Sequence, residues 1–203
     1  MPRPQDHYGK KAKAEGYPAR SVFKLKELLH KFRVLPVGAR VLDLGAAPGS
    51  FSLYLLEQLK GRGKVVAVDL APRIEVPETY DNFSYIVGDL FENDTRDRIA
   101  ADGPFDLVIS DAAPKTSGQK EVDALRSLSL VESVLEIARL CLKPGGSLVV
   151  KIFQGAGEQE YFKELKRYFL TVKGFKPQAS RRESFETYFV GIGFKGTAAS
   201  DRA

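Results

Sequence analysis

Two acidic residues end apolar stretches near the start of the chain, and their placement indicates a ligand that resembles a nucleoside. Asp43 lies in the stretch Val41–Leu44 directly before a glycine turn, and Asp69 ends the next stretch, Gly63–Asp69. An acid roughly 20 residues beyond such a turn commonly binds the two hydroxyls of a ribose. A carboxylate beside the turn would repel a pyrophosphate, but it suits a ligand that carries an ammonium group.

The turn itself reads Gly45-Ala46-Ala47-Pro48-Gly49, which differs from the glycine pattern of dinucleotide-binding proteins. Gly45 and Gly49 lack a Cβ atom where the backbone must turn tightly and where a ligand must come close. An amino group, a ribose and no pyrophosphate favour S-adenosylmethionine over NAD. The alternative, an ordinary strand-to-helix turn with an accidental acid, accounts for Gly45 alone but not for the whole arrangement.

Two further acids follow the predicted third and fourth strands. Asp89 comes after the stretch Phe83–Val87, and Asp111 comes directly after Phe105–Ser110. Ligands of open α/β sheets gather at the carboxyl ends of the strands, near the point where the strand order reverses. Asp89 is therefore placed to accept a hydrogen bond from an adenine amino group, or else it begins a turn. Asp111 lies where catalytic residues are favoured, the alternative being a helix or turn cap.

Two lysines have unusual surroundings in the sequence. Lys151 lies inside the apolar stretch Ser147–Phe153, and a buried ammonium group is costly unless it is paired or its pKa falls. We therefore favour a functional role for Lys151 over a snorkelling lysine on an edge strand. Lys24 lies beside Phe23 but off the apolar stripe of an amphipathic helix, and spacing alone favours a surface lysine there.

The strands that must position these residues follow from hydrophobic periodicity. Apolar stretches alternate with amphipathic ones, which is typical of a single α/β domain with helices on both faces of the sheet. We predict a mostly parallel, seven-stranded sheet with one antiparallel strand. The first predicted strand begins at Val41. The other six are Gly63–Asp69, Phe83–Val87, Phe105–Ser110, Ser147–Phe153, Thr171–Pro177 and Thr187–Phe194.

Particular residues are expected to determine where two of the predicted helices begin or end. Ser50 is expected to cap the helix after the glycine turn. Lys143-Pro144-Gly145-Gly146 is expected to end the longest helix, and the polar stretch Lys115–Asp123 before that helix is predicted to be a mobile loop. The predicted helices are Val22–Leu29, Ser52–Leu59, Glu92–Ala101, Leu125–Leu142 and Glu158–Leu170.

The composition is that of an ordinary globular protein. Of the 203 residues, 43% are hydrophobic and 28% are charged. No stretch of about 18 apolar residues exists, and the first residues lack the apolar segment of a secretory signal. The single cysteine, Cys141, lies in an apolar pattern, so we expect a small core residue, no disulfide and no metal site. We expect a cytoplasmic protein without a membrane partner.

The net charge of +5 is concentrated near the two chain ends. Clustered basic residues beside aromatic ones are typical of a polyphosphate partner, so we favour a nucleic acid over two merely solvated faces. We predict a basic, loosely structured arm over residues 1–15, one domain over residues 16–195 and a disordered tail over residues 196–203. The basic residues are Arg3, Lys10, Lys11, Lys13, Arg20, Lys24, Lys26 and Lys31 in the first group, and Lys173, Lys176, Arg181 and Arg182 in the second.

Five motifs together resemble those of the RrmJ/FtsJ family of S-adenosylmethionine-dependent RNA ribose 2′-O-methyltransferases. The similarity covers nearly the whole chain, from Asp6 to Lys195. It implies a Rossmann-like class I methyltransferase domain and S-adenosylmethionine as the cofactor. The motifs are Ala19–Leu25, Asp43–Gly49, Ser110–Pro114, Val149–Gly155, and Ala179–Arg181 with Ser184–Tyr188.

The resemblance also implies a catalytic tetrad formed by Lys24, Asp111, Lys151 and Glu186. It replaces the interpretation of Lys24 as a surface lysine. We expect Lys151 to take or steer the proton of a ribose hydroxyl while Lys24 lowers the pKa of Lys151 and orients the ribose. The alternative is that the nearby carboxylates raise the pKa of Lys151, which then stays charged and orients the hydroxyl. Asp111 and Glu186 would then fix the two ammonium groups.

The cofactor contacts follow from the turn and from the resemblance together. Ser50 stands where the family often has glycine, and Phe51 stands where it often has tryptophan. Phe51 keeps an apolar face but lacks the indole N–H donor. The expected contacts are Asp43, Gly45, Pro48, Gly49, Phe51, Asp69, Asp89 and Asp111.

The resemblance leaves the RNA substrate open. A compact chain without an extra domain is similar to the ribosomal branch, which implies a uridine of large-subunit rRNA, free or in the assembled subunit, and we expect a monomer. The stretch Tyr8–Tyr17 is also similar to the branch that methylates tRNA anticodon loops. A binding-only RNA module would not need the tetrad, and a small-molecule methyltransferase would leave the two basic groups unexplained.

Overall fold

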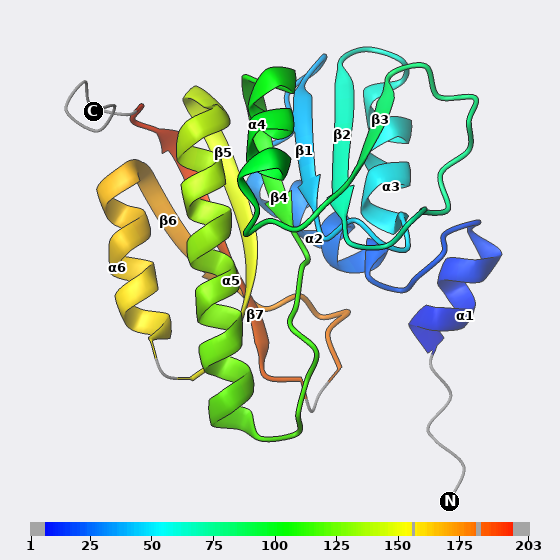
Figure 1. Cartoon of the computed structure of the whole chain (residues 1–203). Helices are drawn as coiled ribbons and strands as arrows, with labels where there is room; N and C mark the ends of the chain where they lie inside the picture. Colours follow the sequence, from blue (N-terminus) through cyan, green and yellow to red (C-terminus); the bar gives the residue numbers. More distant parts are fainter. Residues whose placement is uncertain (1–6, 156, 182–183, 197–203) are drawn as a thin grey trace, which may run out of the picture.

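Seven strands form one mixed sheet, and helices cover both of its faces (Figure 1). The computed structural model describes residues 7–155, 157–181 and 184–196. Among these residues the strand order is β3-β2-β1-β4-β5-β7-β6, and β7 alone runs antiparallel to its neighbours. The predicted fold class is therefore confirmed. The strands are β1 (Arg40–Leu44), β2 (Lys64–Asp69), β3 (Phe83–Val87), β4 (Phe105–Ser110), β5 (Leu142–Phe153), β6 (Phe169–Phe175) and β7 (Glu186–Phe194).

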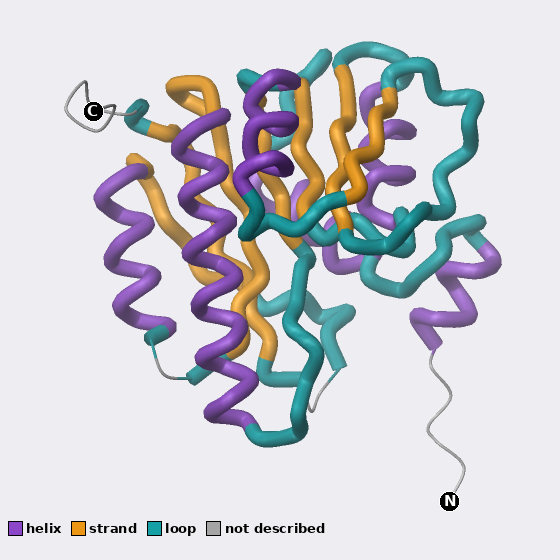
Figure 2. Tube along the Cα trace, in the orientation of Figure 1, coloured by secondary structure: helices purple, strands orange, loops and turns teal. Residues whose placement is uncertain are grey.

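The helices form two layers, with α4, α5 and α6 on one face of the sheet and α2 and α3 on the other (Figures 1 and 2). The central strands are apolar at nearly every position because both faces are covered. On β1, Leu42 and Leu44 pack toward α5, and Val41 packs toward α3. The helices are α1 (His7–Ala14), α2 (Val22–Phe32), α3 (Ser50–Leu59), α4 (Asn93–Asp102), α5 (Lys120–Cys141) and α6 (Glu158–Tyr168).

Helix α5 and strand β5 both begin earlier than predicted. The predicted loop Lys115–Asp123 ends at Gln119, because the Asp123 carboxylate accepts hydrogen bonds from the N–H groups of Ser117 and Gly118 and holds the turn before α5. Strand β5 begins at Leu142, which pairs with Phe105 across a register shift. The Pro-Gly-Gly sequence therefore produces an irregularity within the strand rather than a break.

Two predictions for the first 50 residues are wrong. Residues 7–14 of the predicted loose arm form helix α1, which is held against α2 by the buried Ala12 and by a ring contact between Tyr8 and Phe23. Ser50 does not cap α3: the cap position is Gly49, and the Ser50 hydroxyl oxygen accepts a hydrogen bond from the Ala19 N–H at 2.7 Å. Ser50 thus ties the start of α3 to the segment that leads into α2.

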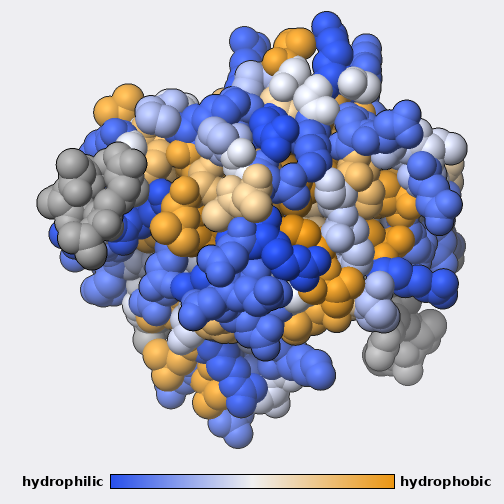
Figure 3. All heavy atoms as spheres, turned by 45° about the horizontal axis from the view of Figure 1, so that its top comes forward, coloured by the Kyte–Doolittle hydropathy of each residue, from blue (hydrophilic) through white to orange (hydrophobic). Residues whose placement is uncertain are grey.

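Some predictions fall outside the described residues, among them residues 1–6 of the arm, residues 197–203 of the tail, and Arg182. Cys141 is buried as predicted. Within the described part of the chain no helix is both long and apolar enough to cross a membrane. On the face drawn in Figure 3, hydrophilic side chains prevail and apolar ones gather in several smaller groups.

Candidate active site

A pocket of about 790 Å³ opens at the carboxyl ends of β1, β2, β3 and β4, beside α5. This volume is within the range of small-molecule sites. Four of the predicted cofactor residues line the pocket: Gly45, Asp69, Asp89 and Asp111. Gly45 has φ +75°, and a Cβ atom there would lie 2.5 Å from the Ala112 Cα, so only glycine fits this close approach of two backbones.

Backbone N–H groups fix two acids of the pocket, Asp69 and Asp89. The Asp69 carboxylate accepts hydrogen bonds from the N–H groups of Ala47 and Ala71, each at 2.9 Å. The Asp89 carboxylate accepts one from the Phe91 N–H at 3.0 Å. Both acids are therefore held in place at the pocket wall, as a ribose and an adenine amino group would require.

Two apolar side chains at this pocket were not predicted from the sequence. Leu70 is 69% exposed and Phe91 is 55% exposed, although both are large and apolar. Exposed apolar surface that borders a pocket is typical of a binding site for a partly apolar ligand. The signal was available, since the two residues follow the predicted acids Asp69 and Asp89 by one and two positions.

The other predicted cofactor residues lie around the turn rather than in the pocket lining. Pro48 is exposed, whereas Gly49 and Phe51 are buried at the start of α3. Gly49 has φ +115°, and a Cβ atom there would lie 3.2 Å from the Glu75 backbone nitrogen. Phe51 packs in the core between α3 and the sheet. Their contacts with a cofactor therefore stay predictions.

Asp43 is fully buried beneath the turn and does not line the pocket. One of its carboxylate oxygens accepts a hydrogen bond from the Ser52 hydroxyl at 2.6 Å, and the other has no partner among the described residues. Burial raises the pKa of Asp43 to about 7, and the charges of Asp111 and Asp69 act in the same direction. A buried acceptor oxygen without a partner fits a cofactor that carries an ammonium group.

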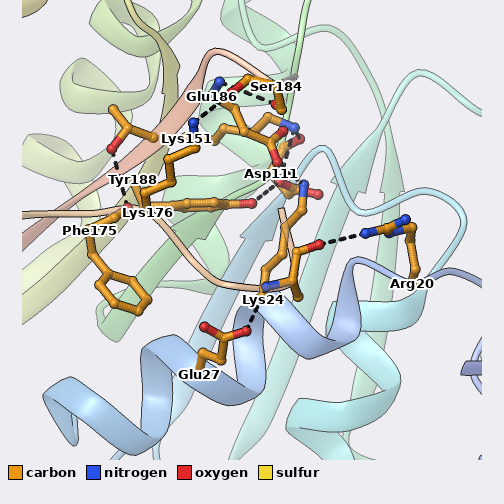
Figure 4. A network of polar contacts seen from close by, with 12 residues as sticks. Arg20, Lys24, Glu27, Asp111, Lys151, Phe175, Lys176, Ser184, Glu186 and Tyr188 are labelled. Carbon is orange, nitrogen blue, oxygen red and sulfur yellow. Dashed lines mark hydrogen bonds and ion pairs between the residues drawn. The ribbon is translucent and has the colours of Figure 1, made fainter. Parts of the chain in front are cut away.

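The four residues of the predicted tetrad lie together as two ion pairs at the same edge of the sheet (Figure 4). The Lys24 Nζ lies 2.5 Å from the Glu186 Oε1, and the Lys151 Nζ lies 2.9 Å from the Asp111 Oδ1. Lys151 also donates a hydrogen bond to the backbone oxygen of Asp111 at 2.5 Å. All four side chains are at most 18% exposed, so both pairs are largely shielded from water.

Four separate elements supply these side chains. Lys24 comes from α2, Asp111 follows β4, and Lys151 and Glu186 come from β5 and β7. In the antiparallel pair of β5 and β7, Lys151 lies opposite Tyr188. Because side chains two residues apart on a strand point to the same face, Glu186 and Tyr188 both face α2, as does Lys151.

The pKa of Asp111 reflects these neighbours. Burial alone would raise it, but the charges of Lys151 and Lys24 outweigh burial and hold the pKa below its ordinary value. A hydrogen bond from the Tyr188 hydroxyl at 2.5 Å acts in the same direction. Asp111 is therefore a carboxylate at neutral pH, and it joins the tetrad to the cofactor pocket because it also lines that pocket.

Tyr188 is a further member of this site that the sequence did not single out. It is fully buried, and burial together with the Asp111 charge raises its pKa well above the ordinary value, so its hydroxyl stays protonated and donates a hydrogen bond to Asp111. The available signal was its position two residues after Glu186, on the same face of a predicted strand.

The basic residues near the chain ends differ in how free their charges are. Lys10 and Lys13 on α1 and Lys173 and Arg181 at the other end of the chain are exposed. The ammonium group of Lys26, in contrast, pairs with Glu15 at 2.7 Å and lies within 5.2 Å of three aromatic ring centres. Lys26 therefore helps to hold α1 against α2, whereas the exposed residues present positive charge to solvent. The three rings belong to Tyr17, Phe23 and Tyr54.

Comparisons with known proteins agree with this geometry. The profile of the FtsJ-like methyltransferase family matches residues 17–194. A protein of Treponema denticola named ribosomal RNA large subunit methyltransferase E is 48% identical over 191 residues, which cover 94% of this chain and 96% of that protein. A protein of the same name from Oleidesulfovibrio alaskensis is 48% identical over 200 residues, which cover 97% and 95% of the two chains.

Solved structures show the same fold. The crystal structure of a ribosomal RNA methyltransferase from Plasmodium falciparum has a TM-score of 0.78 and 28% identity, covering 89% of this chain and all of that one. Aeropyrum pernix fibrillarin with bound S-adenosyl-L-methionine has a TM-score of 0.62 and 19% identity, covering 85% of this chain and 76% of that one. At that lower identity the likeness concerns the fold alone.

Proposed function

Because the chain belongs to the FtsJ-like methyltransferase family, we propose that it transfers a methyl group from S-adenosylmethionine to a ribose 2′-hydroxyl of RNA. The proposed substrate is a uridine of large-subunit ribosomal RNA, free or in the assembled subunit. The observation that carries this proposal is the pair of buried ion pairs directly beside a pocket whose fixed acids suit a nucleoside. We also propose that the protein is a monomer located in the cytoplasm.

The cofactor pocket fits S-adenosylmethionine by its chemistry. Asp69 and Asp89 offer fixed acceptors for a ribose and for an adenine amino group, and Asp43 has an unpartnered buried oxygen for an ammonium group. Bound S-adenosylmethionine supplies an electrophilic methyl group whose displacement by an oxygen nucleophile is an in-line reaction. The rate therefore depends strongly on how well the protein aligns the hydroxyl.

Lys151 is placed to carry out that alignment. Two acceptors on Asp111 take up two of its three N–H donors among the described contacts, which leaves one donor for a ribose oxygen. Lys24, held by Glu186, lies near enough to Asp111 for its charge to lower the Asp111 pKa, so it can contact the same ribose. The two carboxylates keep both ammonium groups fixed before the substrate arrives, so little reorganisation is needed on binding.

The pH dependence of the rate distinguishes an orienting Lys151 from a Lys151 that accepts the hydroxyl proton. Asp111 keeps a lowered pKa, so it adds no limb near neutrality. A limb near neutrality that is present in the wild type and absent in Lys151→Met would identify a general base. We propose the orienting role, in which the wild-type profile has no such limb.

The exposed basic residues support RNA as the substrate. They lie on α1, which contacts the helix that carries Lys24, and on β6 and the segment that leads from β6 to Glu186. Positive charge spread over such a surface contributes affinity for the phosphate backbone without selecting a sequence. Raised salt is therefore expected to weaken RNA binding while leaving cofactor binding unchanged.

One experiment tests the substrate. Labelled methyl transfer from S-adenosylmethionine is measured with naked ribosomal RNA, purified large ribosomal subunits and bulk tRNA, with Lys151→Ala as the inactive control. Label in ribosomal RNA or in subunits supports the proposal and tells whether assembly is required. Label in tRNA alone would move the protein to the anticodon-loop branch. No label in any substrate, with cofactor binding intact, would contradict the proposal and favour a binding-only protein.

A further inference from the structure

The loop between β6 and β7 is tied to α2 by a carboxylate that the proposed chemistry does not use. Glu27, one turn after Lys24 on α2, accepts hydrogen bonds from the backbone N–H groups of Gln178 at 2.7 Å and Ala179 at 2.9 Å, one on each carboxylate oxygen (Figure 4). Arg20 donates a hydrogen bond to the Ala179 backbone oxygen at 2.7 Å. A carboxylate that accepts two backbone N–H groups makes a strong and directional contact.

The docked part of this loop is also buried. Ala179 is 0% exposed and packs with Val22 and Phe23 of α2 and with Leu53 of α3. Packing fixes the distance between the loop and α2, whereas the two hydrogen bonds to Glu27 fix the direction of the backbone. The segment from Lys176 to Phe185, here called the β6–β7 loop, is therefore held against α2 at its beginning.

The same loop ends at a residue of the tetrad. The Lys176 ammonium group donates to the Ser184 backbone oxygen at 2.8 Å, and the Glu186 N–H donates to the Ser184 hydroxyl oxygen at 3.3 Å. The Gln154 N–H donates to the Phe185 backbone oxygen at 2.8 Å. A chain of direct contacts thus leads from the docked residues to the first residue of β7, which is Glu186.

Helix α2 therefore contacts this part of the chain twice, once at the β6–β7 loop through Glu27 and once at the first residue of β7 through the ion pair between Lys24 and Glu186. Residues three apart on a helix lie on the same face, so Lys24 and Glu27 face the loop and the start of β7 from the same side of α2. Glu186 pairs with Phe153 of β5, so a shift of the loop would displace Glu186 from Lys24 only as far as this pairing allows. The same shift would move Arg181, which is exposed at the turn of the loop.

We propose that Glu27 is a positioning residue that fixes the β6–β7 loop, and through it places Glu186 against Lys24 and Arg181 toward the RNA. This inference rests on the proposed function for its RNA part. Glu27 does not line the cofactor pocket, so cofactor affinity is expected to be independent of it. Its effect is expected in the turnover number and in the KM for RNA.

The test compares Glu27→Ala and Glu27→Gln with Glu164→Gln as a matched control. Glu164 lies on α6, where it pairs with Arg167, and has no described contact with the loop. We expect Glu27→Ala to lower kcat for RNA methylation on the order of tenfold to a hundredfold and to raise the KM for RNA, because small displacements of aligning groups are costly. Glu27→Gln keeps one acceptor oxygen and should fall between Glu27→Ala and the wild type. Glu164→Gln should match the wild type.

Amide hydrogen exchange and the backbone amide shift of Glu186 supply a second readout, independent of RNA. In Glu27→Ala, the amides of Gln178 and Ala179 should exchange faster and the Glu186 amide signal should move, at an unchanged Kd for S-adenosylmethionine. Wild-type kcat in Glu27→Ala would overturn the inference, as would a loss of kcat without any change in these amides. If the wild type itself methylates no RNA, the proposed function fails, and the Glu186 amide signal alone then decides whether Glu27 positions it.

Discussion

Asp43, the fourth residue of β1, and Asp111, the first residue after β4, lie near the ends of neighbouring strands, yet their pKa values are shifted in opposite directions. Asp43 has a hydroxyl as its hydrogen-bond partner, and burial raises its pKa to about 7. Asp111 is also largely buried, but Lys151, Lys24 and Tyr188 keep its pKa below the ordinary value. Burial therefore sets the direction of the shift only where no cation lies close. Near pH 7, Asp43 beneath the turn is therefore about half protonated, whereas Asp111 in the tetrad is charged.

The largest expected effect comes from removing the cation that distinguishes the two acids. Lys151→Ala should abolish RNA methylation, with a loss on the order of a thousandfold or more, because it removes the aligning ammonium group and leaves Asp111 without its nearest charge partner. Cofactor binding, measured by calorimetry, should be retained. Methylation near the wild-type rate would contradict the role given to Lys151.

The second ion pair should matter less, because neither Lys24 nor Glu186 lines the cofactor pocket, whereas Asp111 of the first pair does. Lys24→Met and Glu186→Gln are each expected to lower kcat on the order of a hundredfold, since each leaves a shielded partner unpaired. The double variant should cost much less than the product of the two single effects. Independent effects in this kinetic cycle would show that the two residues do not act as a pair.

Tyr188→Phe makes the surroundings of Asp111 more similar to those of Asp43. It removes a single hydrogen bond to a carboxylate, worth about 2 kcal/mol, so kcat should fall by at most about thirtyfold. The hydrogen bond lowers the pKa of Asp111, so its loss should move the acid limb of the rate profile to higher pH. An unchanged limb in Tyr188→Phe would show that this contact does not set the charge of Asp111.

The smallest effect on turnover is expected at Asp43, where the change should appear in stability. Because the folded pKa of Asp43 is raised from 3.8 to about 7, the folded state binds more protons than the unfolded state within that window. The free energy of unfolding of the wild type should therefore fall, relative to Asp43→Asn, as the pH rises through the window, by about 4 kcal/mol at most.

Urea unfolding at several pH values measures this difference between the wild type and Asp43→Asn. With saturating cofactor, Asp43→Asn should methylate RNA at nearly the wild-type rate. Parallel stability curves for the two proteins would show that Asp43 does not bind an extra proton on folding.

Periodicity predicted the sheet well because its strands are buried on both faces. The bounds of β3 and β4 agree with the prediction to the residue, and the predicted apolar stripe of α2 is buried in full. The errors arose where tertiary contacts override local signals. Ser50 bonds to Ala19 instead of capping α3, and Leu142 pairs with Phe105 ahead of a Pro-Gly-Gly sequence that looks like a stop.

The two halves of the candidate site also differ in how far the sequence reveals them. The acids of the pocket stand at the ends of successive strands, so local pattern and strand order were enough to find Asp69 and Asp89. The tetrad joins α2 to β7 across most of the chain, and spacing alone favoured a surface role for Lys24. Before the structure was known, only the resemblance to a family predicted that Lys24 and Glu186 belong to one site. The match over residues 17–194 confirms the family, and the ion pair confirms that the two side chains lie together.

The position of the methyl group within the product nucleoside tests the central claim most directly. Ribosomal RNA labelled by the wild type and by Lys151→Ala is digested to nucleosides and analysed by mass spectrometry. We predict a 2′-O-methylated uridine from the wild type and none from Lys151→Ala. A methyl group on a base, or an equal yield of the ribose product from both proteins, would contradict it.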